Sequence, residues 1–359
     1  MFSTEEKQQY NRHFILDAIG TEGQTKLKNS KVLVVGAGGL GCAILQYLTA
    51  AGVGTIGIID HDTVDQSNLQ RQILFSIATI GEHKARAAAE SLTKLNPFVN
   101  FKTYIEKLTS KNALELFQNY DIIVDGSDNF QTRYLTNDAA LLSNMPLVFG
   151  AIFKFEGQVS VFNYKDGPTY RCLFPKPPSE NSIPNCSDVG VLGVLPGIIG
   201  CLQANETIKM ICEIGDVLSG KLLSFNALNL QQNILKFKKN PAIVIEKLID
   251  YDLFCGIKKE NDFDISTSDL RNLLSTDLVS LIDVRKRMER EHFNIGGIHI
   301  PLHEIHQKID SFSELENIVL YCEVGQRSRI AAKILKEKYP HKNIKSLQNG
   351  IVAWKKTKQ

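Results

Sequence analysis

A glycine-rich run, GAGGLG, stands between an apolar strand pattern and a helical pattern near the start of the chain. A turn in this context binds the phosphates of a nucleotide, because backbone N–H groups of the turn point at the ligand. Gly36 permits the tight turn, Gly38 lets a phosphate approach the backbone, and Gly41 allows close packing of the helix on the strand. The residues expected in the phosphate-binding turn are Gly36, Gly38, Gly39 and Gly41.

Charged and amide side chains follow the next predicted strand. Asp60 closes this strand about twenty residues after the turn, where a carboxylate can bind ribose hydroxyls. Asn68 and Arg71 come just beyond it, and Lys84 opens the following helix. Two cations and an amide suit a triphosphate, which carries more charge than the pyrophosphate of a dinucleotide. The set favours ATP, although the glycines alone fit NAD equally well.

A third apolar strand ends in Asp128, which places a carboxylate at the edge of the sheet where ligands bind in such folds. One carboxylate together with phosphate oxygens is a ligand set that suits Mg²⁺. We therefore expect Asp128 to bind Mg²⁺, with Asn129 beside it in the nucleotide site.

One cysteine, Cys322, ends an apolar strand and precedes a short loop and an alanine-rich helix. Backbone N–H groups of such a loop and the positive end of the helix stabilise a thiolate or a persulfide anion. Arg327 and Arg329 are expected to add positive charge, and Asp283 with Arg285 to brace the loop as an ion pair. The pattern predicts a reactive thiol rather than a buried core cysteine.

A second cysteine, Cys186, ends the segment Lys176–Asp188, which is rich in Pro, Ser and Asn and reads as a long exposed loop. The residues after it, SDVG, are ready to cap a helix, and a thiol near a helix N-terminus has a lowered pKa. From the residues alone, a nucleophile and an incidental loop cysteine are equally compatible with this pattern.

The elements that would position these side chains alternate along the first part of the chain. Strands and helices are predicted within Lys31–Gly52, Thr55–Asp62, His83–Asn96, Asp121–Asp128 and Asn129–Leu142. A capping-box pattern at Ser3–Glu6 begins an earlier helix that runs through Leu16. The alternation implies a doubly wound, Rossmann-like α/β sheet of parallel strands. Gln158–Tyr164 alternates like an antiparallel strand added to that sheet.

The composition turns charged and the strand–helix rhythm breaks between Lys236 and Asp264, which marks a domain boundary. We expect a first domain at residues 1–245, a linker at 246–264 and a smaller α/β domain at 265–359. The last part has its own pattern, with helices at SDLRNLL, RIAAKILKEKY and GIVAWKK and strands at VSLIDV and NIVLYC.

Composition narrows the class of protein. Hydrophobic residues make up 43% and charged residues 22% of the 359 residues, and the formal net charge is +2. This balance argues against a general role on nucleic acids or at a membrane. The N-terminus lacks an apolar signal region, and the most apolar run, Val189–Leu202, is too short to span a bilayer. The seven cysteines, an odd and scattered number, favour a reducing cytoplasm over a disulfide framework.

The residues of the predicted nucleotide site lie within or near five longer segments: RHFIL, GAGGLG, DHDTVDQSNLQRQ, GEHKARAAAESLTKLNP and DGSDNFQTRY. With them the chain resembles the adenylylating enzymes of the MoeB/ThiF family, bacterial relatives of ubiquitin-activating enzymes. The similarity covers about Glu5 to Asn240, and SNLQRQ is highly specific. The resemblance implies ATP-dependent adenylylation of the C-terminal glycine of a small ubiquitin-like sulfur carrier, of MoaD or ThiS type, with release of pyrophosphate.

The resemblance also implies roles for single residues. Asp60 would bind the ribose and Asp128 would bind Mg²⁺. The residues that would bind the phosphates and stabilise charge developing at the α-phosphorus are Asn68, Arg71 and Lys84. Arg12 is similar to a family arginine that reaches the triphosphate of a neighbouring subunit, which implies a homodimer.

Two further family features concern cysteines. PNCSDVGVLG resembles the crossover loop whose cysteine holds the carrier's glycine as a thioester or acyl-persulfide, which implies that Cys186 is a nucleophile. Family members commonly carry two Cys-x-x-Cys pairs that together bind a structural zinc. Here the pairs read Thr169 to Cys172 and Asp252 to Cys255, so each lacks one thiolate and we expect no bound zinc.

The last hundred or so residues carry LIDVR, GGIHIP, CEVGQRSR and GIVAWK, and with these segments they resemble a single rhodanese domain. The resemblance implies that Cys322 carries sulfur as a persulfide, loaded by a donor such as a cysteine desulfurase or thiosulfate.

Together the two parts predict a fused adenylyltransferase and sulfurtransferase, in which sulfur from Cys322 displaces AMP from the carrier to leave a thiocarboxylate. Molybdopterin synthesis, thiamine synthesis and tRNA thiolation all remain open, and the MoeB-like N-terminal segment favours the first. Two alternatives stay open as well: an NAD-linked oxidoreductase with an accessory rhodanese domain, and a non-catalytic scaffold for a ubiquitin-like protein.

Overall fold

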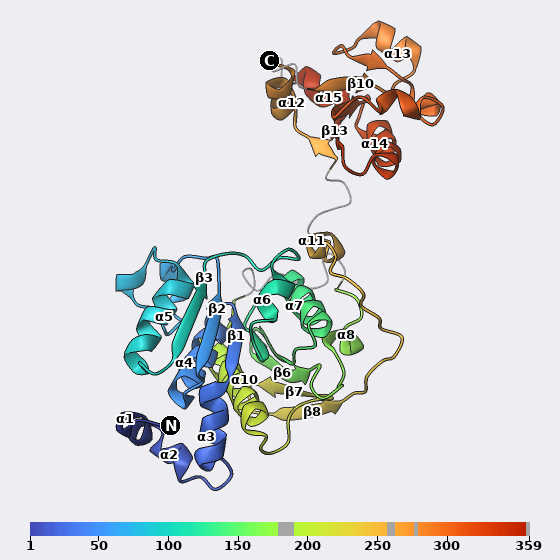
Figure 1. Cartoon of the computed structure of the whole chain (residues 1–359). Helices are drawn as coiled ribbons and strands as arrows, with labels where there is room; N and C mark the ends of the chain where they lie inside the picture. The colour runs from blue at the N-terminus through green and yellow to red at the C-terminus, as the bar shows by residue number, and fades with distance from the viewer. Residues whose placement is uncertain (179–189, 257–262, 276–278, 357–359) are drawn as a thin grey trace. The chain divides into compact units, whose positions relative to one another are not determined.

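The computed structural model describes residues 1–178, 190–256, 263–275 and 279–356. The chain divides into two compact units, Met1–Gly256 and Ile257–Gln359, and each has its own sheet (Figure 1). The division falls inside the segment where the composition of the sequence changes. Within the described ranges, no helix is both long enough and apolar enough to cross a bilayer.

An eight-stranded sheet forms the centre of the first unit, in the order β3-β2-β1-β4-β5-β6-β7-β8. The parallel strands are β1 Lys31–Val35, β2 Thr55–Ile59, β3 Asn100–Tyr104, β4 Ile122–Asp125 and β5 Leu147–Phe153. The strands antiparallel to their neighbours are β6 Glu156–Phe162, β7 Lys221–Asn226 and β8 Gln232–Lys236. The strand order reverses between β1 and β4, which is where doubly wound sheets bind their ligands.

Helices cover both faces of this sheet. They are α1 Thr4–Gln9, α2 Asn11–Phe14, α3 Gly20–Asn29, α4 Gly39–Ala51, α5 Lys84–Leu95, α6 Ala113–Phe117, α7 Phe130–Leu142, α8 Tyr170–Leu173, α10 Val194–Cys212 and α11 Tyr251–Phe254. Two 3₁₀ turns, η1 Gln66–Asn68 and η2 Ile77–Thr79, precede α5. Because side chains alternate along a strand, Val32 and Val34 of β1 pack with residues of α4, α5 and α10, while Leu33 and Val35 pack with residues of α6 and α7. This two-sided burial explains why β1 reads as an unbroken apolar run.

The N-terminal segment differs from the single helix expected between Ser3 and Leu16. The predicted capping box is present, because Ser3 Oγ accepts from Glu6 N at 3.1 Å and Glu6 Oε2 accepts from Ser3 N at 2.8 Å. The helix then stops at the buried Tyr10, whose hydroxyl oxygen accepts from Asn96 Nδ2 at 2.9 Å. A second short helix, α2, follows from Asn11 to Phe14. The next helix, α3, has few apolar residues and therefore shows no helical period in the sequence.

The second unit contains a parallel five-stranded sheet in the order β11-β10-β12-β13-β9. Its strands are β9 Asp264–Ile265, β10 Ser280–Asp283, β11 Ile298–His299, β12 Asn317–Tyr321 and β13 Asn343–Leu347. Its helices and 3₁₀ turns are α12 Thr267–Leu274, α13 Arg287–His292, η3 Leu302–Glu304, η4 Ile309–Phe312, α14 Gln326–Lys338 and α15 Gly350–Lys356. The predicted α/β class, with a doubly wound sheet, added antiparallel strands and a smaller second unit, is confirmed.

Candidate active sites

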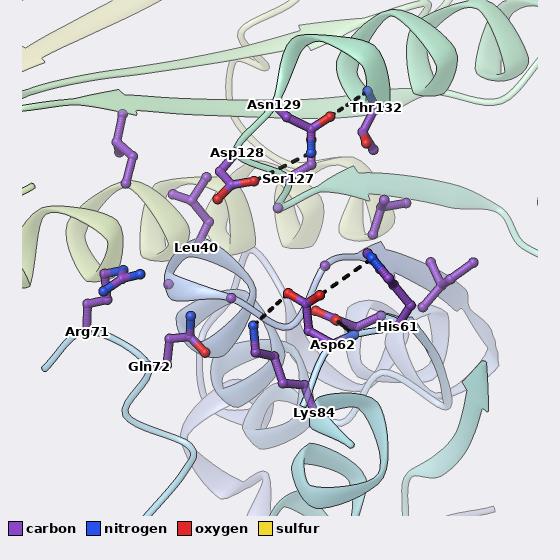
Figure 2. Close-up of a pocket in the computed structure, with 18 of the residues that line it drawn as sticks. Leu40, His61, Asp62, Arg71, Gln72, Lys84, Ser127, Asp128, Asn129 and Thr132 are labelled. Atoms are coloured by element: carbon purple, nitrogen blue, oxygen red, sulfur yellow. Dashed lines mark hydrogen bonds and ion pairs between the residues drawn. The ribbon is translucent and has the colours of Figure 1, made fainter. Parts of the chain in front are cut away.

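A pocket of about 530 Å³ opens at the carboxyl ends of β1, β2 and β4 in the first unit. The predicted residues that line it are Gly36, Gly38, Gly39, Asp60, Arg71, Lys84, Asp128 and Asn129. They come from separate segments, which converge because parallel strands end at the same edge of the sheet. Figure 2 shows this cavity in close-up.

The glycine turn has a backbone that other residues could not adopt without strain. Gly36 has a left-handed φ of 91°. A Cβ at Gly41, in the first turn of α4, would come within 2.0 Å of the Gly36 carbonyl oxygen. A Cβ at Gly38 would instead meet nothing nearer than the Gln72 amide nitrogen at 3.8 Å. Gly41 therefore serves close packing, while Gly38 leaves open space in which a phosphate can approach the backbone.

The carboxylate of Asp60 is anchored by backbone amides. Ala37 N donates to Asp60 Oδ2 and Asp62 N donates to Asp60 Oδ1, each at 2.8 Å. Burial raises the pKa of Asp60, and these two hydrogen bonds oppose that effect. Because each carboxylate oxygen can accept more than one hydrogen bond, Asp60 can still bind ribose hydroxyls. The Ala37 contact ties this residue to the glycine turn.

Lys84 lies at the start of α5, and its ammonium faces a carboxylate that the sequence analysis did not assign. Lys84 Nζ lies 2.9 Å from Asp62 Oδ2, and Lys84 N donates to the Asp62 carbonyl oxygen at 3.0 Å. The Lys84 side chain is 8% exposed and that of Asp62 is 53% exposed. Asp62 thus gives a nearly buried cation a counter-ion at the wall of the cavity (Figure 2). The signal in the sequence was the motif DHD, in which Asp62 follows Asp60 by two positions.

Arg71 and Asp128 bring opposite charges to the cavity. Arg71 Nη1 donates to the Ser67 carbonyl oxygen at 3.2 Å, and within the described part of the chain it forms no ion pair with a carboxylate. Asp128 is exposed, and Asn129 Nδ2 lies 3.5 Å from its Oδ1. Asn129 also caps α7, because its Oδ1 accepts from Thr132 N at 2.9 Å. In Figure 2, Asp128 and Asn129 lie across the opening from Lys84.

The surroundings of Asp128 fit a magnesium ion bound by one carboxylate and by phosphate oxygens. Its carboxylate is exposed on the cavity wall and has one long contact to an amide, so its oxygens remain open to a cation. The donor atoms of Asp60, His61 and Asp62 also lie within 4.8 Å of one another. Those carboxylates already accept from backbone amides and from Lys84, which favours Asp128 as the magnesium ligand.

Three predicted site residues lie elsewhere. Asn68 belongs to η1, where its Oδ1 accepts from Asp65 N at 3.1 Å. Arg12 is exposed on α2. Among the described residues that line the cavity, neither Asn68 nor Arg12 is present. Cys186 falls within residues 179–189, outside the described residues. The roles expected for these three residues stay predictions.

The two half-motifs for zinc make other contacts. Cys172 Sγ accepts from Thr169 N and from Asn240 N, both at 3.4 Å. Burial raises the pKa of Cys255 to about 11, which favours the thiol over the thiolate that zinc requires. Within the described ranges, Cys172, Asp252 and Cys255 belong to no cluster of metal-binding side chains. The residues present do not fit a four-ligand zinc site, and the absence of zinc stays a prediction for metal analysis.

A buried ion pair joins the same two segments. Arg171 Nε and Nη2 donate to the two oxygens of Asp138, at 2.8 and 2.7 Å, and the Tyr251 hydroxyl donates to Asp138 Oδ2 at 2.7 Å. Because Arg171 lies in α8, Asp138 in α7 and Tyr251 in α11, one carboxylate connects three helices.

In the second unit, Cys322 directly follows β12 and is fully buried. Gly325 N donates to Cys322 Sγ at 3.2 Å, and Ser328 Oγ lies 3.5 Å from the same sulfur. Gly325 has a left-handed φ of 88° and caps α14, which starts at Gln326, ahead of the segment RIAAKILKEKY that was predicted as a helix. N–H and O–H groups aimed at the sulfur stabilise a thiolate or a persulfide anion.

The first turn of α15 is hydrogen-bonded to the backbone of this loop. Ile351 N donates to the Cys322 carbonyl oxygen at 2.9 Å, and Val352 N donates to that of Glu323 at 3.1 Å. A Cβ at Gly350 would come within 2.3 Å of the Cys322 oxygen. The cysteine loop and the last helix of the unit are therefore packed backbone against backbone.

The two arginines that follow Cys322 are each paired with a carboxylate, which the sequence analysis did not expect. Arg327 donates to both oxygens of Glu289, at 2.7 and 2.6 Å. Arg329 donates to both oxygens of Asp264, with its Nε at 2.8 Å. The partners come from α13 and β9, so nothing in the motif itself indicates them.

The predicted ion pair between Asp283 and Arg285 is confirmed. Arg285 Nε and Nη2 donate to the two Asp283 oxygens at 3.0 and 2.9 Å, and both side chains are buried. Arg285 Nη1 also donates to Glu323 Oε2 at 3.2 Å. The pair thus braces the loop through the residue next to Cys322.

Family models match both units. The model of the ThiF family matches residues 10–244, and that of the rhodanese-like domain matches residues 266–357. Among curated proteins, the chain is 41% identical to a probable adenylyltransferase/sulfurtransferase MoeZ of Mycobacterium tuberculosis, over 99% of this chain and 95% of that protein. It is 42% identical to the adenylyltransferase and sulfurtransferase MOCS3 of Drosophila persimilis, over 96% of this chain and 82% of that protein.

Two further similarities cover a smaller share of the chain. The chain is 48% identical to a sulfur carrier protein adenylyltransferase of Thermus thermophilus, over 72% of this chain and 99% of that protein. Among solved structures, E. coli MccB with MccA-N7isoASN superposes with a TM-score of 0.60 at 22% identity, over 68% of this chain and 75% of that chain. At this identity the second likeness concerns the fold alone.

Proposed function

The chain belongs to the ThiF family and ends in a rhodanese-like domain, and on this basis we propose that it activates and then thiolates a ubiquitin-like sulfur carrier. The carrier would be of MoaD or ThiS type, with its C-terminal glycine as the reacting residue. The observation that carries the first step is the convergence of the glycine turn, Asp60, Arg71, Lys84 and Asp128 on one cavity.

In the first step a carboxylate oxygen of the carrier attacks the α-phosphorus of ATP, and pyrophosphate leaves. Asp60 would bind the ribose, and the N–H groups of the glycine turn would face the phosphates. Lys84 and Arg71 would stabilise the charge that develops around the α-phosphorus, because both cations lie on the cavity wall. Mg²⁺ bound by Asp128 and phosphate oxygens would neutralise part of the triphosphate charge.

In the second step the outer sulfur of a Cys322 persulfide attacks the acyl adenylate, and AMP leaves. The product is an acyl disulfide, which a second thiol must open to release the thiocarboxylate. Cys186 is expected to hold the acyl group of the carrier between the two steps, as a thioester or an acyl-persulfide, and this role stays a prediction. Support for the role of Cys322 comes from the Gly325 N–H and the Ser328 hydroxyl that face its sulfur.

We propose a homodimer in the cytoplasm as the working form. Arg12, expected to reach a neighbouring subunit, is exposed beside Ile15 and Leu16, which expose apolar side chains. An exposed apolar patch next to a site residue is typical of an interface between subunits. The cytoplasmic location rests on the odd and scattered number of cysteines in the sequence, seven, which disfavours a disulfide framework.

The deciding experiment is ATP–pyrophosphate exchange by the purified full chain with each candidate carrier, followed by the intact mass of the carrier. We expect exchange only when a carrier is present, and replacement of a carboxylate oxygen by sulfur once a sulfur donor is added. NAD-dependent hydride transfer without exchange would favour the oxidoreductase alternative. Carrier binding without ATP and without turnover would favour the scaffold.

A further inference from the structure

A buried carboxylate behind the wall of the nucleotide cavity, Asp125, ends β4 three positions before Asp128. Asp125 is only 1% exposed and is absent from the described residues that line the cavity. Its Oδ1 accepts from Ser127 N at 2.9 Å, whereas its Oδ2 has no hydrogen-bond partner in the described part of the chain. Burying a carboxylate with an unpaired oxygen costs stability, so packing alone does not explain this residue.

The hydrogen bond to Ser127 shapes the turn that leads from β4 to the cavity. An aspartate that accepts from the amide two positions further on fixes the backbone between them. The next residues, Ser127, Asp128 and Asn129, lie at the cavity (Figure 2). Because Asp128 directly follows Ser127, the bond from Asp125 sets the direction in which Asp128 meets the cavity.

Backbone contacts hold the start of the same turn. Gly126 N donates to the Val35 carbonyl oxygen at 2.8 Å, and a Cβ at Gly126 would come within 3.1 Å of the Gly36 oxygen. From α10, Gln203 Nε2 donates to the Asp125 carbonyl oxygen at 2.7 Å. These contacts fix the turn as far as Gly126, and Asp125 Oδ1 extends the fixed part to Ser127.

A buried cation favours the ionised form of Asp125. Arg133 of α7 is 8% exposed, and its guanidinium lies over the rings of Phe130 and Phe149, 5.5 and 5.6 Å from their centroids. Burial raises the pKa of Asp125, the charge of Arg133 opposes this effect, and the charge of Asp128 adds to it. An asparagine could accept from Ser127 N equally well, so the turn does not require a charge. A negative charge that interacts with Asp128 also attracts a cation bound there.

From these contacts we propose that Asp125 is a positioning residue for the magnesium ion: it orients Asp128 through the Ser127 N–H, and its buried charge strengthens binding of the cation. The inference rests on the proposed adenylylation, in which Asp128 is the magnesium ligand. The two contributions are separable by substitution. Asp125→Asn keeps an oxygen that accepts from Ser127 N and removes only the charge, whereas Asp125→Ala removes both.

The test measures how tightly the full chain binds Mn²⁺, which replaces Mg²⁺ because free Mn²⁺ has an electron paramagnetic resonance signal. The titrations contain a saturating non-hydrolysable ATP analogue. We expect Asp125→Ala to weaken Mn²⁺ binding by about 10–100-fold and Asp125→Asn by about three- to tenfold, as is typical when groups that orient a metal ligand are replaced. Affinity for the analogue in the presence of a chelator should stay unchanged, because the cavity itself is intact.

ATP–pyrophosphate exchange provides a second measurement. The Mg²⁺ concentration that gives half the maximal rate should rise by the same factors, while kcat at saturating Mg²⁺ should change by less than about threefold. A residue needed only for folding would instead lower the active fraction, and kcat would fall without a change in the Mg²⁺ requirement. Asp125→Asn keeps the shape of the side chain, so it tests the proposal even if Asp125→Ala does not fold.

The matched control lies at the other end of the same strand. Asp121 directly precedes β4, and its Oδ2 also accepts from a backbone amide, that of Lys31, at 2.8 Å. Asp121→Ala is therefore expected to leave Mn²⁺ binding unchanged. Asp128→Asn, which alters the proposed ligand itself, should cause the largest loss.

Three results would contradict the proposal, each in a different way. Unchanged Mn²⁺ binding in both Asp125 variants would mean that Asp125 has no effect on the metal. A loss in Asp121→Ala as large as that in Asp125→Ala would indicate general loosening of β4. Unchanged Mn²⁺ binding in Asp128→Asn would show that Asp128 is not the ligand.

The same experiments separate this inference from the proposed function. If Mn²⁺ binding follows the expected order but no carrier supports exchange, the positioning role of Asp125 stands and the proposed adenylylation of a carrier is wrong. If exchange occurs with a carrier and the Asp125 variants bind Mn²⁺ like the wild type, the adenylylation stands and the positioning role is wrong.

Discussion

The two candidate sites hold their cations in opposite ways. At the nucleotide cavity, Lys84 has a half-exposed carboxylate partner, and Arg71 contacts a backbone carbonyl oxygen. At the thiol loop, Arg327 and Arg329 are each bonded to both oxygens of a carboxylate. A guanidinium that is already matched by a carboxylate attracts a further anion weakly. The number of cations in a motif therefore predicts an anion site only where their partners are known.

The sites also differ in the size of what they can admit. The first is an open cavity of about 530 Å³, whereas Cys322 is fully buried. A bound persulfide extends the cysteine by one S–S bond, about 2 Å. The first site thus suits a whole nucleotide, while the second needs to present only one atom to its partner.

The two sites would not be independent of each other if one substitution disabled both of them. Lys84→Ala is expected to lower ATP–pyrophosphate exchange by about 10²–10³-fold, because a cation that stabilises the transition state is lost. It should leave sulfur loading of Cys322 intact, which the intact mass of the full chain measures. Cys322→Ala should do the reverse and abolish sulfur loading. Loss of exchange in Cys322→Ala would show that the two sites are not separate.

The buried ion pair of Asp283 with Arg285 is expected to contribute more to the free energy of unfolding than the exposed pair of Arg287 with Glu291. Asp283→Ala leaves the buried Arg285 with Glu323 as its remaining carboxylate partner, and it is expected to lower the free energy of unfolding of the second unit by about 3–5 kcal/mol. Trp354 is the one tryptophan of the chain and lies in α15, so its fluorescence in a denaturant titration reports this unit. Glu291→Gln, in the exposed pair with Arg287, should change the same quantity by less than about 1 kcal/mol.

A smaller effect is expected at the half-exposed partner of Lys84. Asp62→Asn removes a charge that competes with phosphates for the ammonium, so the KM for ATP should fall by less than about tenfold. Steady-state exchange kinetics measure this change, with Asp65→Asn as a nearby control of equal charge. A loss of kcat as large as that of Lys84→Ala would instead mean that Asp62 is required to orient Lys84.

The smallest effect concerns pH. Folding lowers the pKa of Glu289 from 4.5 to about 2, mainly through hydrogen bonds from Arg327. A lowered pKa stabilises the fold above the unfolded value, and this contribution is lost as pH falls through the folded value. The difference in unfolding free energy between wild type and Glu289→Gln should therefore be constant down to about pH 4.5 and shrink below it. Denaturant titrations followed by Trp354 fluorescence measure it, and an unchanged difference at pH 3 would contradict the ion pair.

Much of the nucleotide site was predictable because its residues follow the ends of parallel strands. Asp60 directly follows β2, Asp128 comes three positions after β4, and the glycine turn follows β1, so their meeting at one edge follows from the sheet. The pairing at the thiol loop was not predictable. Glu289 lies 38 positions from Arg327, and Asp264 lies 65 positions from Arg329. Their contacts depend on how α13 and β9 pack, which no local spacing encodes.

The missed features of the first unit have similar causes. Asp62 ends the segment Thr55–Asp62 that was predicted as a strand, and its role emerges only when α5 brings Lys84 beside it. Tyr10, where α1 ends, is hydrogen-bonded to Asn96, which lies 86 positions away. The pattern of apolar residues in a sequence predicts helices, strands and burial. The role of Asp62 and the end of α1 at Tyr10 involve single tertiary contacts, which that pattern does not predict.

The contacts between α15 and the cysteine loop can form only late in synthesis of the chain. Strand β12 and Cys322 leave the ribosome before Gly350, Ile351 and Val352, whose backbone meets the carbonyl oxygens of the loop. A nascent chain that has not reached α15 carries the cysteine without these contacts. Reactivity of the thiol is thus expected to mature late in translation, and a chain truncated before Gly350 should retain the nucleotide cavity while its sulfur chemistry fails.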